Sequence, residues 1–515
     1  MESLEQLIAL FLAAVLLAGV ARRMGAPYPV FLAVGGALLA FLPTVPFFAI
    51  PPELALAIFV APVLLDAAYD ASLRDLKDNW VPVSGLVVCA VGLTTAAVAV
   101  VARALVPAMP WAPAIALGAI VAPPDAVAAT AVLRPLHPPH RILTILEGES
   151  LLNDATALLI YRLALGAVAA GSFSLAGVAP TFLLAVVGSI VVGPALGWVS
   201  LRLMDRVRHV PTAIILQFVS TFTVWLVAER IGLSGVLTMV SYAITVAQSA
   251  PARIPARLRI PAYAVWETVV FALNILAFIF IGLQIRPILD SLAPADLGRY
   301  LTVAAAVLVT VIVVRIVWTM TFNALVRWRH RRSGFHPPRP MLRPTVASGM
   351  IVSWAGMRGI VSLAAALALP PAFSFRGLIV LTAFAVVLGT LVVQGLTLKP
   401  LMRAFDVHDD DPVGREVAAA RVQALEAGLL LLDREDSPAA ATVREEFSAH
   451  FTDQYLADGT EASDAKHGEL HRRAVAAARE AVLAMRASRD IGDDAFHRLE
   501  EELYWLEMAV RRPEE

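Results

Sequence analysis

The polar residues best suited to do chemistry interrupt an apolar stretch at residues 142–162. This stretch has the length, about 20 residues, that a helix needs to cross a bilayer. Its centre carries Glu149, Ser150, Asn153 and Asp154. On a helix Ser150 and Asp154 are four residues apart and share a face, as do Glu149 and Asn153. Because hydroxyl and carboxylate oxygens are hard ligands, Ser150 and Asp154 predict a site for a dehydrated alkali cation rather than a transition metal.

The carboxylates also decide how this stretch can sit in a membrane. A charge at the bilayer centre costs about 2.5–3.5 kcal/mol, and each Leu or Ile returns about 0.3–0.6 kcal/mol. The nine Leu and Ile residues of the stretch offset roughly 3–5 kcal/mol, against roughly 5–7 kcal/mol for Glu149 and Asp154. A single membrane Asn or Ser usually only joins helices, but a carboxylate beside Asn153 favours a functional site. We expect neighbouring helices, water or a cation to complete it.

A second polar interruption follows two prolines at Pro123 and Pro124, in the sequence AIVAPPDAVAATAV. Each proline lacks a backbone donor, so we expect the helix to break there. Broken backbone at membrane depth is tolerated only where it faces protein or a water-filled cavity. Two prolines could produce a mere kink, but Asp125 directly after the break favours an ion site.

A third interruption places Arg358 between Gly356 and Gly359 in the apolar sequence WAGMRGIVSLAAALALP. A buried arginine keeps its proton and must find an anion or a ring of carbonyl groups. Glu149 is the candidate anion. We therefore predict a structural ion pair between Glu149 and Arg358 that holds the two helices together.

Other polar residues within the predicted membrane spans are weaker candidates for the ion site. Asp66, in the sequence PVLLDAA, lies about a turn from mid-depth and is a further candidate for the ion site. Glu267, Asn274 and Arg315 are more typical of packing or orienting residues than of ligands.

These residues require many membrane helices to position them. Of 515 residues, 58% are hydrophobic and only 16% charged, and the mean hydropathy is +0.73, which favours a polytopic, all-α membrane protein. We predict thirteen membrane spans, at residues 4–21, 28–48, 53–70, 81–105, 113–133, 142–163, 176–201, 211–229, 232–249, 265–285, 301–326, 345–369 and 377–398. The boundary that the sequence marks least clearly is the one at residues 229–232, between the eighth and ninth spans.

Basic residues predict the orientation of these spans. Lys and Arg collect after the odd-numbered spans, as at Arg22 and Arg23, and are scarce after the even-numbered ones. Since such residues concentrate on the cytoplasmic side, the N-terminus is expected outside and the C-terminus in the cytoplasm. The acidic start, with Glu2 and Glu5, is a poor signal peptide, so the first span should be retained.

The two interrupted helices, which are the fifth and twelfth spans, lie seven spans apart. They therefore cross the membrane in opposite directions. Interrupted helices at corresponding places of inverted halves are typical of a transporter's binding site. The halves would be two inverted six-helix repeats with broken helices that cross, spans 1–6 and 8–13.

The chain divides into a membrane domain at 1–402 and a tail at 403–515, where charged residues become frequent. Apolar residues there keep helical spacing, which predicts a helical cytosolic extension. It could be a solvated appendage or a regulatory or dimer-contacting domain. A single cysteine, Cys89, excludes an intramolecular disulfide and a cysteine metal cluster.

The motifs GESLLNDATAL, PPDAVAA, PVLLDAA and WAGMRGIVSLAAALALP together resemble the NhaP-like branch of the monovalent cation–proton antiporters, which is related to the eukaryotic sodium–proton exchangers. The resemblance covers about residues 1–400. It implies thirteen helices in two inverted repeats, commonly a homodimer, and exchange of Na⁺ or Li⁺, sometimes K⁺, for H⁺.

The resemblance also implies roles for individual residues. Asp154 would be the main ion- and proton-binding carboxylate, with Asn153 beside it, and Asp125 and Ser150 would add oxygens for Na⁺. Glu149 and Arg358 match the family's buried ion pair. The adjacent Asn and Asp, in place of two aspartates, resemble the electroneutral branch.

Two positions depart from the family's pattern, and both touch the expected coordination shell. The break often reads Thr-Asp-Pro in the family, but here Pro124 precedes Asp125, so a threonine ligand is missing. The acid of the third span is often Glu and here is Asp66.

The expected function is therefore secondary antiport of Na⁺ or Li⁺ against H⁺ in a plasma membrane, such as a bacterial inner membrane. Cation and proton would compete for a buried Asp. A K⁺–proton antiporter or another cation pathway is the main alternative, and a membrane ion or pH sensor that signals through the tail is a second. We find no nucleophile–base pair, phosphate loop, cofactor motif or nucleic-acid motif in the sequence, so we expect neither an enzyme nor a resident cofactor.

Overall fold

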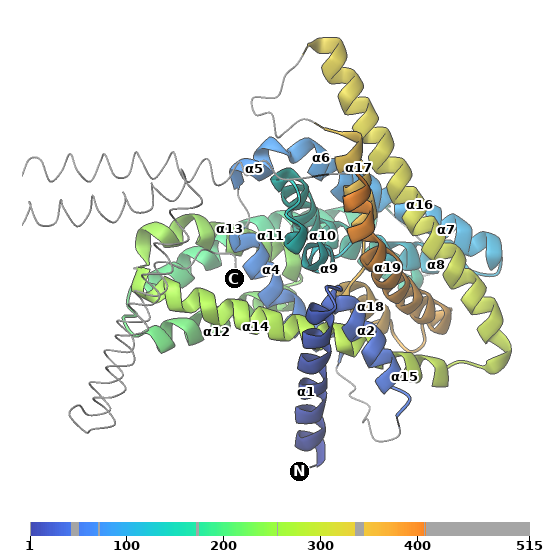
Figure 1. Ribbon diagram of the computed structural model, residues 1–515, viewed down its shortest axis with the longest axis horizontal. Helices are drawn as coiled ribbons and strands as arrows, with labels where there is room; N and C mark the ends of the chain where they lie inside the picture. The colour runs from blue at the N-terminus through green and yellow to red at the C-terminus, as the bar shows by residue number, and fades with distance from the viewer. Residues whose placement is uncertain are drawn as a thin grey trace, which may run out of the picture. The chain divides into compact units, whose positions relative to one another are not determined.

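The computed structural model describes residues 2–42, 51–70, 73–170, 175–254, 256–334, 344–405 and 407 (Figure 1). Every regular element in these residues is a helix. The predicted tail at 403–515 lies outside the described residues, apart from its first few positions.

The first half of the described chain runs from α1 to α10. Its helices include two π-helical segments, η1 and η2, and the 3₁₀ turn η3. In order they are α1 (Glu2–Arg23), α2 (Tyr28–Leu39), α3 (Pro52–Ala55), η1 (Leu56–Val60), α4 (Ala61–Asp70), α5 (Leu73–Asp78), α6 (Trp80–Ser84), η2 (Gly85–Ala90), α7 (Val91–Leu105), α8 (Trp111–Val121), α9 (Ala126–Leu133), η3 (Arg134–Leu136) and α10 (His140–Ala170).

The second half runs from α11 to α19 and contains the longest helix, α16. Its helices are α11 (Leu175–Met204), α12 (Val210–Arg230), α13 (Gly235–Arg253), α14 (Ala256–Leu283), α15 (Ile285–Asp290), α16 (Pro294–Ser333), α17 (Val346–Trp354), α18 (Ile360–Leu367) and α19 (Arg376–Phe405).

The described residues include nine helical stretches long and apolar enough to cross a membrane, and two shorter apolar helices. The described part of the chain is therefore all-helical, and the protein is a multi-pass membrane protein. The uncertain boundary near residues 229–232 does separate two helices, because α12 ends at Arg230, Gly232 adopts a positive φ of 75° and α13 begins at Gly235. The number of thirteen crossings and the inverted repeats stay predictions.

Both predicted breaks are present, and each divides one predicted span into two short helices. The first separates α8 from α9 at residues 122–125, where Pro123 and Pro124 supply no amide hydrogen to the preceding turn. The second separates α17 from α18 at residues 355–359. The C-terminal end of α8 and the N-terminal end of α9 therefore expose backbone groups inside the bundle.

The apolar core consists chiefly of two clusters that border the breaks. The larger one joins α1 and α2 to α7–α10, α14 and α16–α19. The second joins η1, α4, α12 and α13 to faces of α10 and α14. Ile360, at the start of α18, packs against both clusters. The second break thus lies where the two clusters meet.

Candidate functional site

The two helix breaks contact each other directly. The backbone N–H of Asp125, in the first break, donates to the carbonyl oxygen of Met357, in the second, at 2.6 Å. Gly359 makes room for the first break, because a β-carbon built on it would lie 1.6 Å from Oδ2 of Asp125. A side chain at residue 359 is therefore incompatible with this position of the Asp125 carboxylate.

Asp125 is held by the helix that it begins. It is the N-cap of α9, and its Oδ1 accepts a 2.9 Å hydrogen bond from the backbone N–H of Val127. An acidic N-cap satisfies a free amide group and lies at the positive end of the helix dipole. One carboxylate oxygen is thus fixed, and Oδ2 lies on the side of Gly359.

Helix α10 braces the first break from the other side. Asn153 is fully buried, and its Nδ2 donates to the carbonyl oxygen of Pro124 at 2.9 Å. Ser150 Oγ accepts a 3.4 Å hydrogen bond from the backbone N–H of Ala126. Within the described residues, no donor reaches Oδ1 of Asn153. The breaks expose backbone groups, and the polar side of α10 satisfies them.

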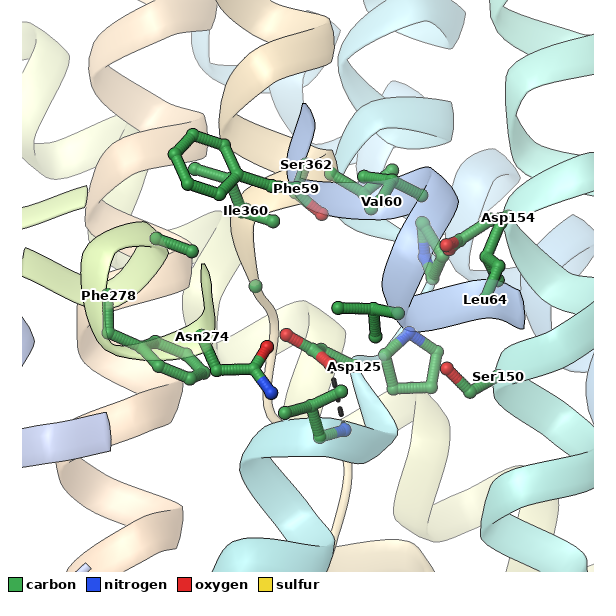
Figure 2. A pocket seen from close by; sticks show the side chains of 17 residues that line it. Phe59, Val60, Leu64, Asp125, Ser150, Asp154, Asn274, Phe278, Ile360 and Ser362 are labelled. Carbon is green, nitrogen blue, oxygen red and sulfur yellow. Dashed lines mark hydrogen bonds between the residues drawn. The ribbon is translucent and has the colours of Figure 1, made fainter. Parts of the chain in front are cut away.

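A small cavity lies where these elements meet, and Figure 2 shows the side chains around it. Its volume is about 50 Å³. One water needs roughly 10–15 Å³ of such volume, so the cavity has room for a few waters or for one cation with part of its hydration. Its polar side chains are Asp125, Ser150, Asp154, Asn274 and Ser362.

The cavity lies between the broken helices and two further elements. The π-helical turn η1 and α4 contribute Phe59, Val60 and Leu64, and α14 contributes Asn274 and Phe278 (Figure 2). A π-helical turn within a helix often marks a functional site. These apolar walls limit the contact of the two carboxylates with bulk water.

The structure brings together three of the predicted site residues, Asp125, Ser150 and Asp154, as lining residues of one cavity. Asn153 is adjacent in sequence to Asp154, but in the structure its amide braces the break and it does not line the cavity. Asp66 is half-buried on α4 and is likewise not a lining residue, whereas Val63 and Leu64 are. The geometry therefore gives Asp66 no place at the cavity wall.

The predicted ion pair between Glu149 and Arg358 is wrong, because Glu149 pairs with a different arginine. Glu149 binds Arg315 of α16, whose Nη1 and Nη2 donate to the two carboxylate oxygens at 2.5 and 2.8 Å. Both side chains are buried, with exposed fractions of 3% and 1%. The guanidinium of Arg315 also donates to the carbonyl oxygens of Val352 and Ser353, in the last turn of α17.

Arg358 is surrounded by carbonyl groups, which is the second arrangement, besides an anion, that can satisfy a buried arginine. Its Nε donates to Val121 at 3.0 Å and its Nη2 to Ala122 at 3.2 Å, at the C-terminal end of α8, and its Nη1 donates to Gly356. Its own backbone N–H donates to Thr390 of α19 at 3.1 Å. A cation at the negative end of a helix stabilises it. Each interrupted helix therefore has an arginine at the end of its first half.

Sequence reasoning missed two features of this arrangement. Asn274 was expected to pack or orient, yet it lines the cavity, and its only signal was a polar side chain at membrane depth. Gly356 was singled out only as a neighbour of Arg358, but a β-carbon there would lie 2.3 Å from Cδ of Arg315. That contact places Arg315 against the second break.

The chain is similar to known membrane transporters. The family model described as "Sodium/hydrogen exchanger, transmembrane" matches residues 8–404. An uncharacterised Na⁺/H⁺ exchanger of Mycobacterium bovis is 32% identical over 421 residues, covering 78% of this chain and 74% of that protein. The sodium, potassium, lithium and rubidium/H⁺ antiporter of Bacillus subtilis is 28% identical over 510 residues, covering 95% of this chain and 75% of that protein.

A solved structure shares the fold. The sodium proton antiporter MjNhaP1 of Methanocaldococcus jannaschii at pH 8 superposes with a TM-score of 0.60 at 17% sequence identity, covering 78% of this chain and 98% of that one. The family match spans the described helices, including both breaks and the cavity between them. The protein therefore belongs to the sodium/hydrogen exchanger family of membrane transporters.

Proposed function

We propose that this protein exchanges Na⁺ or Li⁺ for H⁺ across the plasma membrane, at the cavity that Asp125 and Asp154 line. One observation carries the proposal: the carboxylate of Asp125, at the start of α9, shares one small cavity at the junction of two helix breaks with the carboxylate of Asp154 and the hydroxyl of Ser150, both on α10. Hard oxygen ligands of this kind suit a monovalent cation as substrate.

Exchange follows from competition for the carboxylates. An ionised Asp154 in a cavity with apolar walls is costly unless a counter-charge neutralises it. A proton or a cation can do so, but the two do not bind well together. The site can then cross the apolar barrier when a proton or a cation is bound. It cannot cross when neither the proton nor the cation is bound. One cation would replace one proton, which makes the exchange electroneutral.

Movement would occur between the two groups of helices that border the cavity. The broken helices and α10 are joined by hydrogen bonds, whereas the side chains that α4 and α14 present to the cavity are mostly apolar, such as Leu64 and Phe278, with Asn274 as the polar one. Apolar contacts can slide without leaving unpaired hydrogen bonds. We infer that the broken helices and α10 move together against α4 and α14, opening the cavity to each side in turn.

Potassium is the alternative cation. The printed name of the Bacillus subtilis relative includes sodium, potassium, lithium and rubidium. In this chain Pro124 occupies the position where the family often has threonine, which removes one oxygen ligand. A cavity with fewer fixed ligands discriminates less by size, so K⁺ must be included in any assay.

We also infer the setting in which the exchanger works. The basic residues at the end of α16, among them Arg331 and Arg332, favour a cytoplasmic location for that end, with the N-terminus outside and the C-terminus in the cytoplasm. The resemblance to NhaP-like antiporters supports a homodimer.

The experiment uses purified full-length protein in acid-loaded proteoliposomes with a pH-sensitive dye. Na⁺, Li⁺ and K⁺ are added in turn to wild type, Asp154→Asn, Asp125→Asn and the control Asp290→Asn. Asp290 is exposed, and its one ion pair within the described residues is a 3.7 Å contact with Arg286. We expect Na⁺ or Li⁺ to dissipate the gradient in wild type and control and in neither of the other variants.

Each outcome bears on the proposal. Exchange that survives in Asp154→Asn would remove this carboxylate from the mechanism. Exchange with K⁺ alone would select the alternative cation. A cation-dependent change in the protease sensitivity of the tail without any flux would favour a sensor. Addition of valinomycin and K⁺ tests stoichiometry, because an electroneutral exchange rate is unaffected by membrane potential.

A further inference from the structure

A second cavity, much larger than the first, lies at the end of the bundle that carries the basic end of α16. Its volume is about 860 Å³, and its walls come from α6, η2, α10, α16 and α17. None of its lining residues lines the cation cavity. Ligand pockets are typically about 300–1,000 Å³, so this volume is suited to an organic molecule rather than to an ion.

The inner wall of this second cavity is apolar and aromatic, with one unsatisfied hydroxyl. Trp318 and Phe322 of α16 line it together with Ile145 of α10 and Val352 of α17. Thr319 is 7% exposed, and within the described residues its Oγ1 has no hydrogen-bond partner. A buried unpaired hydroxyl is unfavourable. The inner wall therefore has the character of a site for an apolar chain that brings one hydrogen-bonding group.

The mouth of the cavity is positively charged. Arg141 donates through Nε to Oδ1 of Asn79 at 3.1 Å, and its two terminal nitrogens make no hydrogen bond to the described part of the chain. Arg329 and His330, from the end of α16, also line the mouth, and among the described lining residues Asp78 is the only acidic one. The positive end of the α17 dipole lies here as well. An anionic group is therefore favoured at the mouth.

An exposed tryptophan relates the cavity to the membrane surface. Trp80, at the mouth, is 65% exposed, and exposed tryptophans are enriched at the membrane–water interface. An inorganic anion would occupy only the mouth and leave the aromatic interior unfilled. A neutral lipid would fill the interior and leave the guanidinium of Arg141 unmatched.

We propose that this cavity binds one anionic phospholipid, with its phosphate at Arg141 and Arg329 and an acyl chain along Trp318 and Phe322. The carbonyl groups of the glycerol esters lie between head and chain and can accept the hydrogen bond of Thr319. This site shares no lining residue with the cation cavity, and lipid binding there does not depend on which cation the protein exchanges.

The bound lipid would influence exchange through the buried ion pair. Ile145 lies one helical turn before Glu149, and the carbonyl of Val352 accepts a hydrogen bond from Arg315. A lipid that fills the cavity therefore packs against the two helix turns that hold this ion pair. We expect anionic lipid to stabilise the first half of the second broken helix and to raise the rate of exchange.

The experiment measures lipid retention by native mass spectrometry of the full-length protein, with phosphatidylglycerol, phosphatidylcholine or inorganic phosphate added. The variants are the double variant Arg141→Gln with Arg329→Gln, Thr319→Val, and Val326→Trp, which fills the cavity. Arg299→Gln is the control, because Arg299 is an exposed residue near the other end of α16. Val326→Trp keeps every charge, so it tests the cavity without altering the basic mouth.

Wild type and Arg299→Gln should retain one phosphatidylglycerol at collision energies that remove the other lipids. Apparent affinity for that lipid should fall at least tenfold in the double variant and in Val326→Trp, and less in Thr319→Val. Equal retention by all variants, or equal retention of phosphatidylcholine, would overturn the proposal. Displacement of the lipid by inorganic phosphate would also overturn it, in favour of a site for a soluble anion.

Discussion

A β-carbon on Gly359 would lie 1.6 Å from Oδ2 of Asp125. The backbone of the second broken helix therefore occupies the space directly beside the carboxylate of the first. Glycine at residue 359 is required by this close approach and not by an unusual backbone angle, because its φ is −131°. The carboxylate and the glycine form one contact that neither helix provides alone.

We expect Gly359→Ala to abolish exchange. The methyl group would displace the Asp125 carboxylate from the cavity, and a displacement of about 1 Å can cost roughly a hundredfold in rate at a preorganised site. Proteoliposome flux measures the loss. Gly298→Ala is the matched control, since no heavy atom lies within 4 Å of a β-carbon there. Normal exchange by Gly359→Ala would show that the carboxylate need not stay where the structure has it.

The partner of Glu149 can be identified by double-mutant cycles. Removal of one member of a buried ion pair leaves an uncompensated charge and costs about 3–5 kcal/mol. Glu149→Gln combined with Arg315→Leu should be much less destabilised than the sum of the single changes, whereas Glu149→Gln combined with Arg358→Leu should be close to additive. Unfolding by sodium dodecyl sulfate in mixed micelles provides the measurement. Equal coupling in both cycles would contradict the pairing with Arg315.

Arg358→Lys should destabilise the protein although the charge is kept. A lysine ammonium lacks the planar fork that reaches Val121, Ala122 and Gly356 at once. Loss of one such hydrogen bond from a charged donor costs about 1.5–3 kcal/mol. Arg376→Lys is the comparison, because Arg376 binds two carbonyl groups at the end of α18 in a partly exposed position. If the two substitutions lower the midpoint of thermal unfolding equally, burial of Arg358 has no special role.

Competition between proton and cation predicts how exchange depends on pH. Acidification protonates the carboxylate that the cation needs, so the apparent KM for Na⁺ should rise while the maximal rate stays constant. One proton per cation gives a rise of about tenfold per pH unit on the acidic side, and two protons would give about a hundredfold. Initial rates at several Na⁺ concentrations and pH values distinguish the two. A constant KM with a falling maximal rate would exclude direct competition.

Much of the fold could be predicted from sequence, because its causes are local. Pro123 and Pro124 remove two backbone donors wherever they are placed, so the break between α8 and α9 needs no tertiary information. Apolar length likewise identifies most membrane helices. Ser150 and Asp154 were expected on one face of a helix from their spacing alone, and both line the cavity.

The partner of Glu149 could not be predicted, because it depends on contacts between distant helices. Two arginines are buried within the described residues, Arg315 and Arg358, and nothing in the sequence around them says which one reaches Glu149. Two tertiary contacts decide which arginine pairs with Glu149. Gly356 allows Arg315 to lie close to the second break, and α8 presents two free carbonyl groups to Arg358. The absence of Asp66 from the cavity wall has a similar origin, since the rotation of α4 presents Val63 and Leu64 instead.

The hydrogen bonds that join the two breaks run in both directions: Asp125 donates to Met357, and Arg358 donates to Val121 and Ala122. Neither break can shift without the other, so the oxygens around a bound cation would keep their arrangement while the cavity opens to one side or the other. A cation held by the same ligands throughout has the same intrinsic affinity at either membrane face. The apparent affinity for the cation would then be similar when it is measured from either face, while the two ion gradients set the net direction, as they do for every passive exchanger.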